Sequence, residues 1–189
     1  MDMSEEELEK YKIKLLKSKE QSRLISEMHT KIQALINSNE ITDLTPLWHT
    51  NPEDINFFLQ KDQLDEKLLT HGFSIIENVN IEILLDNMED GNPALFRDKI
   101  LYNEDLIDTN ISKVINHWMN NEKLIPPTIT IADNFLTTTL KCPSTINPKL
   151  FASDGKHRLN VACFFGSEHI PIVVLTPQLI TIKDKLGIL

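Results

Sequence analysis

The sequence predicts an α+β protein in which a helical N-terminal region, residues 1–72, precedes a compact mixed α/β domain, residues 73–189. Residues 4–37 contain no glycine or proline and carry a helical apolar pattern. From residue 73, short β-branched segments alternate with segments of helical periodicity. The composition, 41% hydrophobic and 25% charged, is that of a globular chain, and 189 residues favour one domain with an appendage.

The first predicted helix spans residues 4–37. Ser4 and Glu7 form a capping-box pattern, and acidic residues crowd the first turn. One stripe of the helix has the 3-and-4 spacing of a coiled coil: Leu8, Tyr11, Leu15, Ser18, Ser22, Ile25, His29, Ile32 and Ile36. Two interpretations stay open. The helix docks on its own domain, or it forms a coiled coil for self-association or a protein partner, although the two serines and the histidine weaken that seam.

Short helices are expected in residues 41–72. Asn51 is a candidate N-cap with Pro52 at the first helical position, and Gly72 is a candidate end signal. His49 and His71 stand alone, which is typical of surface or capping groups rather than ligands.

From residue 73 we expect a strand at residues 73–76, a second strand at 79–83 and a turn at 90–93. A helix is expected at residues 111–119, and a further strand, entered through two prolines, at 124–131. A loop of about 15 residues with Pro143 and Pro148 follows and suggests a flap or insertion. For the last part of the chain the pattern predicts a strand at residues 150–153, a turn at 154–155 and a helix at 156–165 that ends at Gly166. A final strand is predicted at residues 170–175.

Charge and hydropathy exclude several classes of protein. No apolar run approaches the ~20 residues that cross a bilayer, and the acidic N-terminus differs from a secretory signal, so a cytoplasmic protein without membrane contact is expected. The net charge of −9 is concentrated in residues 41–110, whereas residues 111–189 carry a net +3. This distribution argues against direct DNA binding and allows a local anion site.

The chain contains two cysteines, Cys142 and Cys163, and lacks any CxxC or zinc-like spacing. Cys163 lies in an apolar run and reads as a core residue, while Cys142 precedes a proline in a loop. We therefore expect neither a structural metal nor a required disulfide.

The segment that carries chemistry is the predicted strand–turn–helix around Asp154, Gly155, Lys156, His157 and Arg158. A helix N-terminus offers backbone N–H groups and a positive dipole end, so it binds anions. Arg158 suits bidentate phosphate binding, Lys156 adds a compact charge, and His157 can donate a hydrogen bond or move a proton.

A structural interpretation of the same segment is also open. In it Asp154 caps the helix, Gly155 only makes the turn, and the basic residues form a solvated first turn. Cations at a helix N-terminus oppose the dipole at about 0.3–1 kcal/mol each, which favours the anion site.

The motifs resemble the ParB/sulfiredoxin superfamily over roughly residues 78–177. The resemblance rests on three segments: Ile125-Pro126-Pro127-Thr128-Ile129-Thr130-Ile131, Ser153-Asp154-Gly155-Lys156-His157-Arg158-Leu159-Asn160-Val161-Ala162, and Gly166 with Ile170-Pro171-Ile172-Val173-Val174. It implies a ParB/sulfiredoxin-like fold and a nucleotide site in which Gly155, His157 and Arg158 contact phosphates, with Lys156 adjacent. Members of the superfamily use CTP as a clamp switch, use ATP to repair peroxiredoxin, or phosphorylate free serine.

Departures from the family pattern argue against the sulfiredoxin activity and against a role in chromosome partition. Sulfiredoxins have a catalytic cysteine where this chain has Lys156, and ParB partition proteins continue into a DNA-binding helix-turn-helix. Kinase relatives need an acidic base, for which Asp154, Glu82, Glu89 and Asp90 are the candidates.

The leading hypothesis is a nucleotide-binding protein that hydrolyses a nucleoside triphosphate, ATP or CTP with Mg²⁺, or transfers its phosphate. In this hypothesis Lys156 and Arg158 bind phosphate, and His157 stabilises or protonates the bound phosphate. Asp154 positions the turn or a metal-bound water. The alternative is a non-enzymatic regulatory or adaptor protein on a degenerate ParB-like scaffold. A ParB-like nuclease ranks third, because the acidic surface opposes it.

Overall fold

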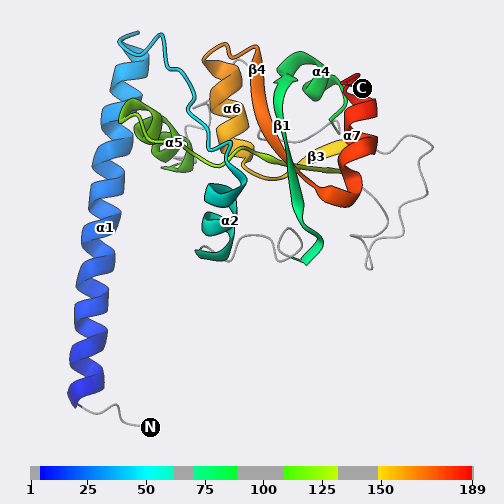
Figure 1. Ribbon diagram of the computed structural model, residues 1–189. Helices are drawn as coiled ribbons and strands as arrows, with labels where there is room; N and C mark the ends of the chain where they lie inside the picture. Colours follow the sequence, from blue (N-terminus) through cyan, green and yellow to red (C-terminus); the bar gives the residue numbers. More distant parts are fainter. Residues whose placement is uncertain (1–4, 62–69, 89–108, 132–148, 189) are drawn as a thin grey trace.

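The computed structural model describes residues 5–61, 70–88, 109–131 and 149–188 and confirms the α+β class (Figure 1). The helices are α1 (Glu5–Asn37), α2 (Pro52–Lys61), α4 (Ile81–Asp86), α5 (Thr109–Met119), α6 (Lys156–Phe164), the 3-10 turn η1 (Thr176–Gln178) and α7 (Leu179–Lys185). The strands are β1 (Phe73–Asn80), β2 (Thr128–Ile131), β3 (Leu150–Asp154) and β4 (His169–Leu175). The predicted turn at residues 90–93, the loop with Pro143 and Pro148, and Cys142 lie outside the described residues.

The four strands form one mixed sheet in the order β1–β4–β2–β3. β1 and β4 are antiparallel, β4 and β2 are parallel, and β2 and β3 are antiparallel. In this register Thr128 at the start of β2 lies between Val173 of β4 and Asp154 at the end of β3. The end of β3, from which α6 starts, is therefore next to the proline-rich entry into β2.

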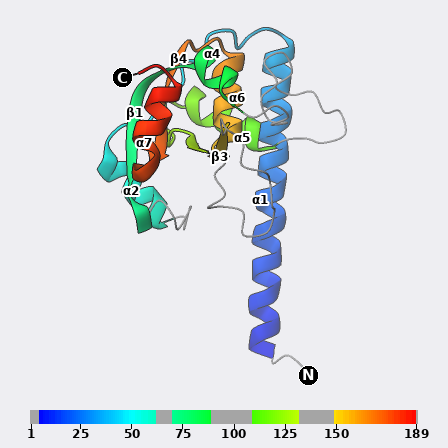
Figure 2. The same cartoon turned by 90° about the vertical axis from the view of Figure 1, so that its right-hand side faces the viewer.

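Helices α5 and α6 lie between α1 and the sheet (Figures 1 and 2). The larger core joins them to the sheet through fully buried residues that include Ile115, Ile129, Leu159, Ile172 and Val174. Leu159 and Ala162 of α6 are buried, and so are Asn160 and Val161 between them. Because α6 packs against α5 and shares the larger core with the sheet, it is covered on more sides than a one-faced surface helix.

The N-terminal helical region shares its cores with the sheet. Ile32 of α1 belongs to the larger core. Ile55 of α2 packs with Ile125, Val173 and Leu175 in a second cluster. The predicted N-cap at α2 is confirmed, because the side-chain oxygen of Asn51 accepts a 3.0 Å hydrogen bond from the backbone N–H of Glu53.

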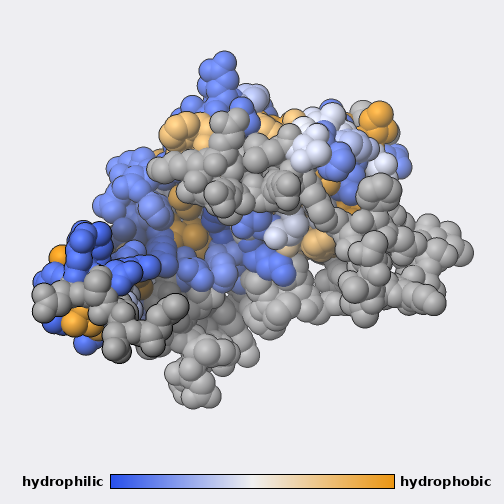
Figure 3. Space-filling model, turned by 90° about the horizontal axis from the view of Figure 1, so that it is seen from below, coloured by the Kyte–Doolittle hydropathy of each residue, from blue (hydrophilic) through white to orange (hydrophobic). Residues whose placement is uncertain are grey.

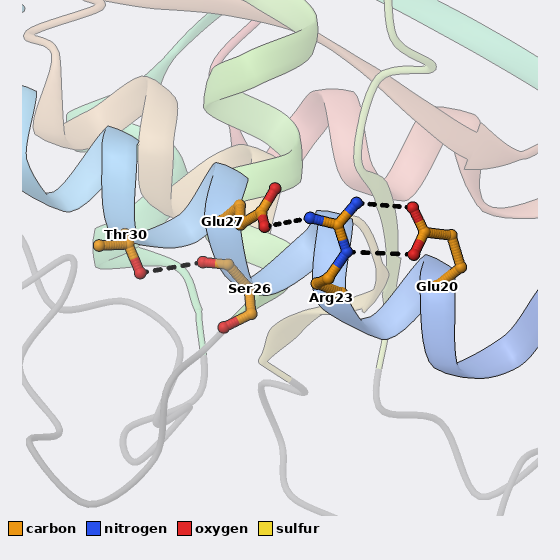
Figure 4. A network of polar contacts seen from close by, with 5 residues as sticks. All are labelled: Glu20, Arg23, Ser26, Glu27 and Thr30. Carbon is orange, nitrogen blue, oxygen red and sulfur yellow. Dashed lines mark hydrogen bonds and ion pairs between the residues drawn. The ribbon is translucent and has the colours of Figure 1, made fainter.

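Helix α1 matches the predicted span, and only its C-terminal part is covered. Ile32 and His29 are buried there, and Met28 and Ile36 pack against the core. The N-terminal part extends away from the rest of the molecule (Figures 1 and 2). Intrahelical ion pairs line this extension, including the network in which Arg23 binds both Glu20 and Glu27 (Figure 4).

The structure corrects the strand predicted at residues 79–83. β1 ends at Asn80, and Ile81 begins the short helix α4. The Asn80 side-chain oxygen accepts a hydrogen bond from the backbone N–H of Ile83 at 3.1 Å, which is an N-cap. The β-branched residues were consistent with a strand, but the cap determines the local conformation. Helix α7 near the C-terminus was not predicted.

Among the described residues, no helix combines the length and the apolar character that crossing a membrane requires.

Candidate functional site

The predicted strand–turn–helix is present, with Gly155 as the N-cap of α6. Gly155 has φ 77° and ψ 19°, a left-handed conformation that L residues with side chains rarely adopt. The first intrahelical bond runs from the N–H of Leu159 to the carbonyl oxygen of Gly155 at 3.0 Å. The first turn carries Lys156, His157 and Arg158 and no acidic residue. The N-cap residue supplies no side-chain hydrogen bond to this helix end.

Close packing is a second reason for glycine at position 155. A Cβ atom there would lie 2.7 Å from the Cα of Pro127 and 2.8 Å from Nη2 of Arg158. The contact with Pro127 involves backbone, which has little freedom to move away. The turn is therefore held tightly against the entry into β2.

Arg158 folds back across this turn. Its Nη1 donates to the carbonyl oxygen of Ile125 at 2.8 Å, and its Nη2 donates to Oδ2 of Asp154 at 2.5 Å. The side chain of Arg158 is 14% exposed and that of Asp154 is 42% exposed. These two bonds use two of the five guanidinium N–H donors and tie the start of α6 to the end of β3 and to the segment before β2.

Lys156 and His157 are half-buried in the same first turn. Lys156 forms no ion pair with the described part of the chain. Because Asp154 neutralises Arg158, the local excess of positive charge comes from Lys156, the helix dipole and His157 when protonated. Gly155, Lys156, His157 and Arg158, all predicted as ligand-binding residues, thus occupy one turn, with Arg158 held by protein contacts.

The segment before α2 is hydrogen-bonded to the residue that precedes Ile125, the partner of Arg158. The N–H of His49 donates to the carbonyl oxygen of Leu124 at 2.9 Å, and the N–H of Leu124 donates to that of Leu47 at 2.9 Å. Leu124 precedes Ile125, whose carbonyl oxygen binds Arg158. Hydrogen bonds therefore connect the His49 segment to the base of α6.

The acidic candidates occupy different places. Asp154 is the last residue of β3 and accepts a hydrogen bond from Arg158. Glu82 is on α4, whose first residue, Ile81, donates its N–H to the carbonyl oxygen of Glu168 beyond the C-terminal end of α6. Glu82 is therefore at the opposite end of α6 from Gly155. Glu89 and Asp90 lie outside the described residues.

Other candidate ligands do not gather in the described ranges. No group of three or more His, Cys, Asp or Glu side chains suited to a metal ion occurs in these ranges. Cys163 is half-buried and packs against the larger core.

Sequence reasoning missed the bond from Arg158 to the carbonyl oxygen of Ile125. The i, i+4 spacing of Asp154 and Arg158 across the predicted start of the helix was a signal for the ion pair. The Ile125 contact joins residues 33 apart and has no local signal.

Comparison of the chain with protein-family models, with curated proteins and with solved structures found no match. The likeness to the ParB/sulfiredoxin superfamily therefore rests on the sequence motifs alone.

Proposed function

We propose that this protein binds the phosphates of a nucleoside triphosphate, ATP or CTP, at the N-terminus of α6. The observation that carries the proposal is the first turn of α6, which has three basic residues, no acidic residue and no side-chain cap. Asp154 neutralises Arg158, but Lys156 opposes the helix dipole, and so does His157 when it is protonated, so an anion at this turn offsets an otherwise unfavourable arrangement. The ParB/sulfiredoxin-like motifs, which include the same residues, also imply phosphates at this turn.

The residues of the turn have complementary roles in this proposal. Lys156 contributes a compact positive charge, and the backbone N–H groups of the first turn face the phosphate oxygens. Arg158, oriented by Asp154 and Ile125, contributes its remaining N–H donors. His157 donates a hydrogen bond to a phosphate oxygen and, when protonated, a proton to the nucleoside diphosphate that leaves as the terminal phosphate passes to water or an acceptor.

Mg²⁺ enters this proposal with the nucleotide rather than through a carboxylate cluster in the described residues. When bound, it neutralises charge on the phosphate oxygens during hydrolysis or transfer of the terminal phosphate. The chain's own contribution is then orientation of the phosphates at the α6 turn and proton donation by His157.

The test is thermal denaturation with ATP, ADP, CTP and GTP in Mg²⁺, on wild type and Lys156→Ala. A ligand at 100 times its dissociation constant adds about 2.7 kcal/mol, which is roughly 5–10 °C for a chain of this size. We expect a selective shift in wild type that Lys156→Ala loses. Lys31→Ala, which removes an exposed lysine charge on α1, is the matched control and keeps the shift.

For Arg158→Ala, the change in melting temperature on adding nucleotide is compared with that of wild type. The melting temperature without nucleotide is not used as evidence on binding, because the substitution also removes two internal hydrogen bonds. Phosphate release measured on the same samples separates binding from hydrolysis. No shift with any nucleotide, or a shift that survives in both Lys156→Ala and Arg158→Ala, overturns the proposed site.

The second candidate is a non-enzymatic adaptor protein. The observation that favours it is the part of α1 that extends from the body with large apolar side chains exposed. In this reading the basic turn of α6 is structural and α1 binds a protein. The nucleotide panel separates the two candidates, because only the first predicts stabilisation that depends on Lys156.

A further inference from the structure

The apolar stripe of α1 is covered along one part and open along the other. Near its C-terminal end the stripe is packed, with His29 and Ile32 buried. Toward the N-terminus the same stripe continues through Leu8, Tyr11 and Leu15, whose exposed fractions are 44%, 58% and 44%. Helix α5 covers the first part, and no described element covers the second. We call Leu8, Tyr11 and Leu15 the open seam.

The open segment has the length of an interaction element. Residues 5–24 correspond to about 30 Å of helix at 1.5 Å per residue. Seen from below, the protruding N-terminal end of α1 is mostly hydrophilic, with hydrophobic residues between (Figure 3). Exposed helices of such length gain most of their stability by burying an apolar face.

The charges on this segment are separated into two blocks. The acidic block is Glu5, Glu6, Glu7 and Glu9, and the basic block is Lys10, Lys12, Lys14, Lys17 and Lys19. Lys10 and Lys12 pair with glutamates of the same helix. Lys14, Lys17 and Lys19 form no ion pair with the described residues. Helical spacing places Lys14 and Lys19 beside the open seam and Lys17 on the far side, so a helix that covers the seam is expected to carry acidic groups opposite Lys14 and Lys19.

We propose that the open seam of α1 pairs with the open seam of a second copy of this chain in antiparallel orientation. In that orientation the acidic block of each copy lies beside lysines of the other. A parallel pair would place acidic block against acidic block and lysines against lysines, which is unfavourable. Antiparallel pairing also points the two folded bodies away from each other, so α5 of each copy stays in place.

The test of association is sedimentation equilibrium of the full chain over a range of concentrations. We expect twice the mass of one chain for wild type and the mass of one chain for the double variant Leu8→Gln/Leu15→Gln. The control is Ile13→Gln/Leu24→Gln, two residues of similar exposure (46% and 52%) that helical spacing places on the opposite side. It remains a dimer. Neither pair is part of the cores, so thermal stability at dilution reports an intact fold.

Orientation is tested with a variant in which every charge of the two blocks is reversed. Antiparallel pairing predicts that the reversed chain and the wild type each form homodimers in native mass spectrometry and that these homodimers persist in a mixture. Parallel pairing predicts the opposite, because reversed and wild-type blocks then attract. Far-ultraviolet circular dichroism verifies that the reversed helix forms.

Mixed dimers that form in place of both homodimers overturn the antiparallel orientation. A monomeric wild type, or a Leu8→Gln/Leu15→Gln variant that still dimerises, overturns self-association through the open seam. Binding of a different protein by monomeric wild type would assign the seam to a heterologous partner.

Discussion

Arg158 and Asp154 are joined by a 2.5 Å ion pair across one helical turn, and the carbonyl oxygen of Ile125 takes a second hydrogen bond from the same guanidinium. The pair brackets Gly155, so one side chain connects the last residue of β3, the first turn of α6 and the segment that leads into β2. The basic turn is therefore preorganised by the protein itself. A ligand at this turn would not need to order Arg158 on binding.

Arg158→Ala is expected to destabilise the protein by about 1–3 kcal/mol, because it leaves the Ile125 carbonyl and the Asp154 carboxylate without their donor. Asp154→Ala is expected to have a smaller effect, since its side chain is 42% exposed and water can replace part of the lost contact. Urea denaturation of both variants and of the double variant gives the coupling energy. A coupling of zero would show that the ion pair does not contribute to stability.

Gly155→Ala is expected to be more destabilising than Gly166→Ala. Both glycines have a positive φ, 77° and 74°, so both variants incur about 1–2 kcal/mol of backbone strain. Only at position 155 does the added Cβ approach backbone, 2.7 Å from the Cα of Pro127, whereas nothing lies within 4 Å at Gly166. The difference between the two free energies of unfolding therefore measures the steric part, about 1–3 kcal/mol. Equal losses would indicate that Pro127 moves freely.

The strand–turn–helix was predictable because its signals are local. Gly155 and Gly166 mark both ends of α6, and both adopt the positive φ that made glycine informative. The position of Arg158 was not predictable in the same way. The charge of Arg158, taken alone, favours a solvent-exposed side chain that binds an anion. Its contact with Ile125 instead depends on how two segments distant in the sequence pack together.

The error at α4 has a similar cause on a shorter scale. Ile81 and Ile83 continue the β-branched alternation of β1, so hydrophobic pattern alone extends the strand. The capping side chain of Asn80 ends the strand and starts a helix. Asn80 as a candidate N-cap, followed by the acidic residue Glu82 in the first turn, predicts a helix as strongly as the alternation of Ile81 and Ile83 predicts a strand.

Ser112→Ala is expected to loosen the packing of α1 on α5. Nδ1 of His29 and Oγ of Ser112 share a 2.6 Å hydrogen bond, and both residues are buried. Removing the hydroxyl leaves a buried imidazole nitrogen without this partner, at a cost of about 1–3 kcal/mol. Ser22→Ala is the control, since the Ser22 hydroxyl bonds only a backbone oxygen on the exposed part of α1, and a change within about 0.5 kcal/mol is expected. Hydrogen exchange of the α1 and α5 amides would locate the loss, and unchanged protection there would contradict it.

The network around Arg23 predicts how the exposed part of α1 responds to acid. The pKa of Glu20 lies below its ordinary value of 4.5, chiefly because Arg23 donates hydrogen bonds to its carboxylate (Figure 4). A carboxyl whose pKa is lowered in the folded state binds fewer protons than in the unfolded chain. Its contribution to stability is therefore fully present above pH 4.5 and is lost as the pH falls through the lowered value.

Titration of the Glu20 side-chain carboxyl by carbon-detected nuclear magnetic resonance measures this directly. The pKa is expected below 4.5 in wild type and closer to 4.5 in Arg23→Gln, with a smaller difference in 1 M salt because the pair is exposed and screened. Glu53, whose backbone N–H binds Asn51 at the start of α2, is the internal reference, because Arg23→Gln removes no contact of this residue. An identical Glu20 titration in wild type and variant would mean that the Arg23 contact does not persist in solution.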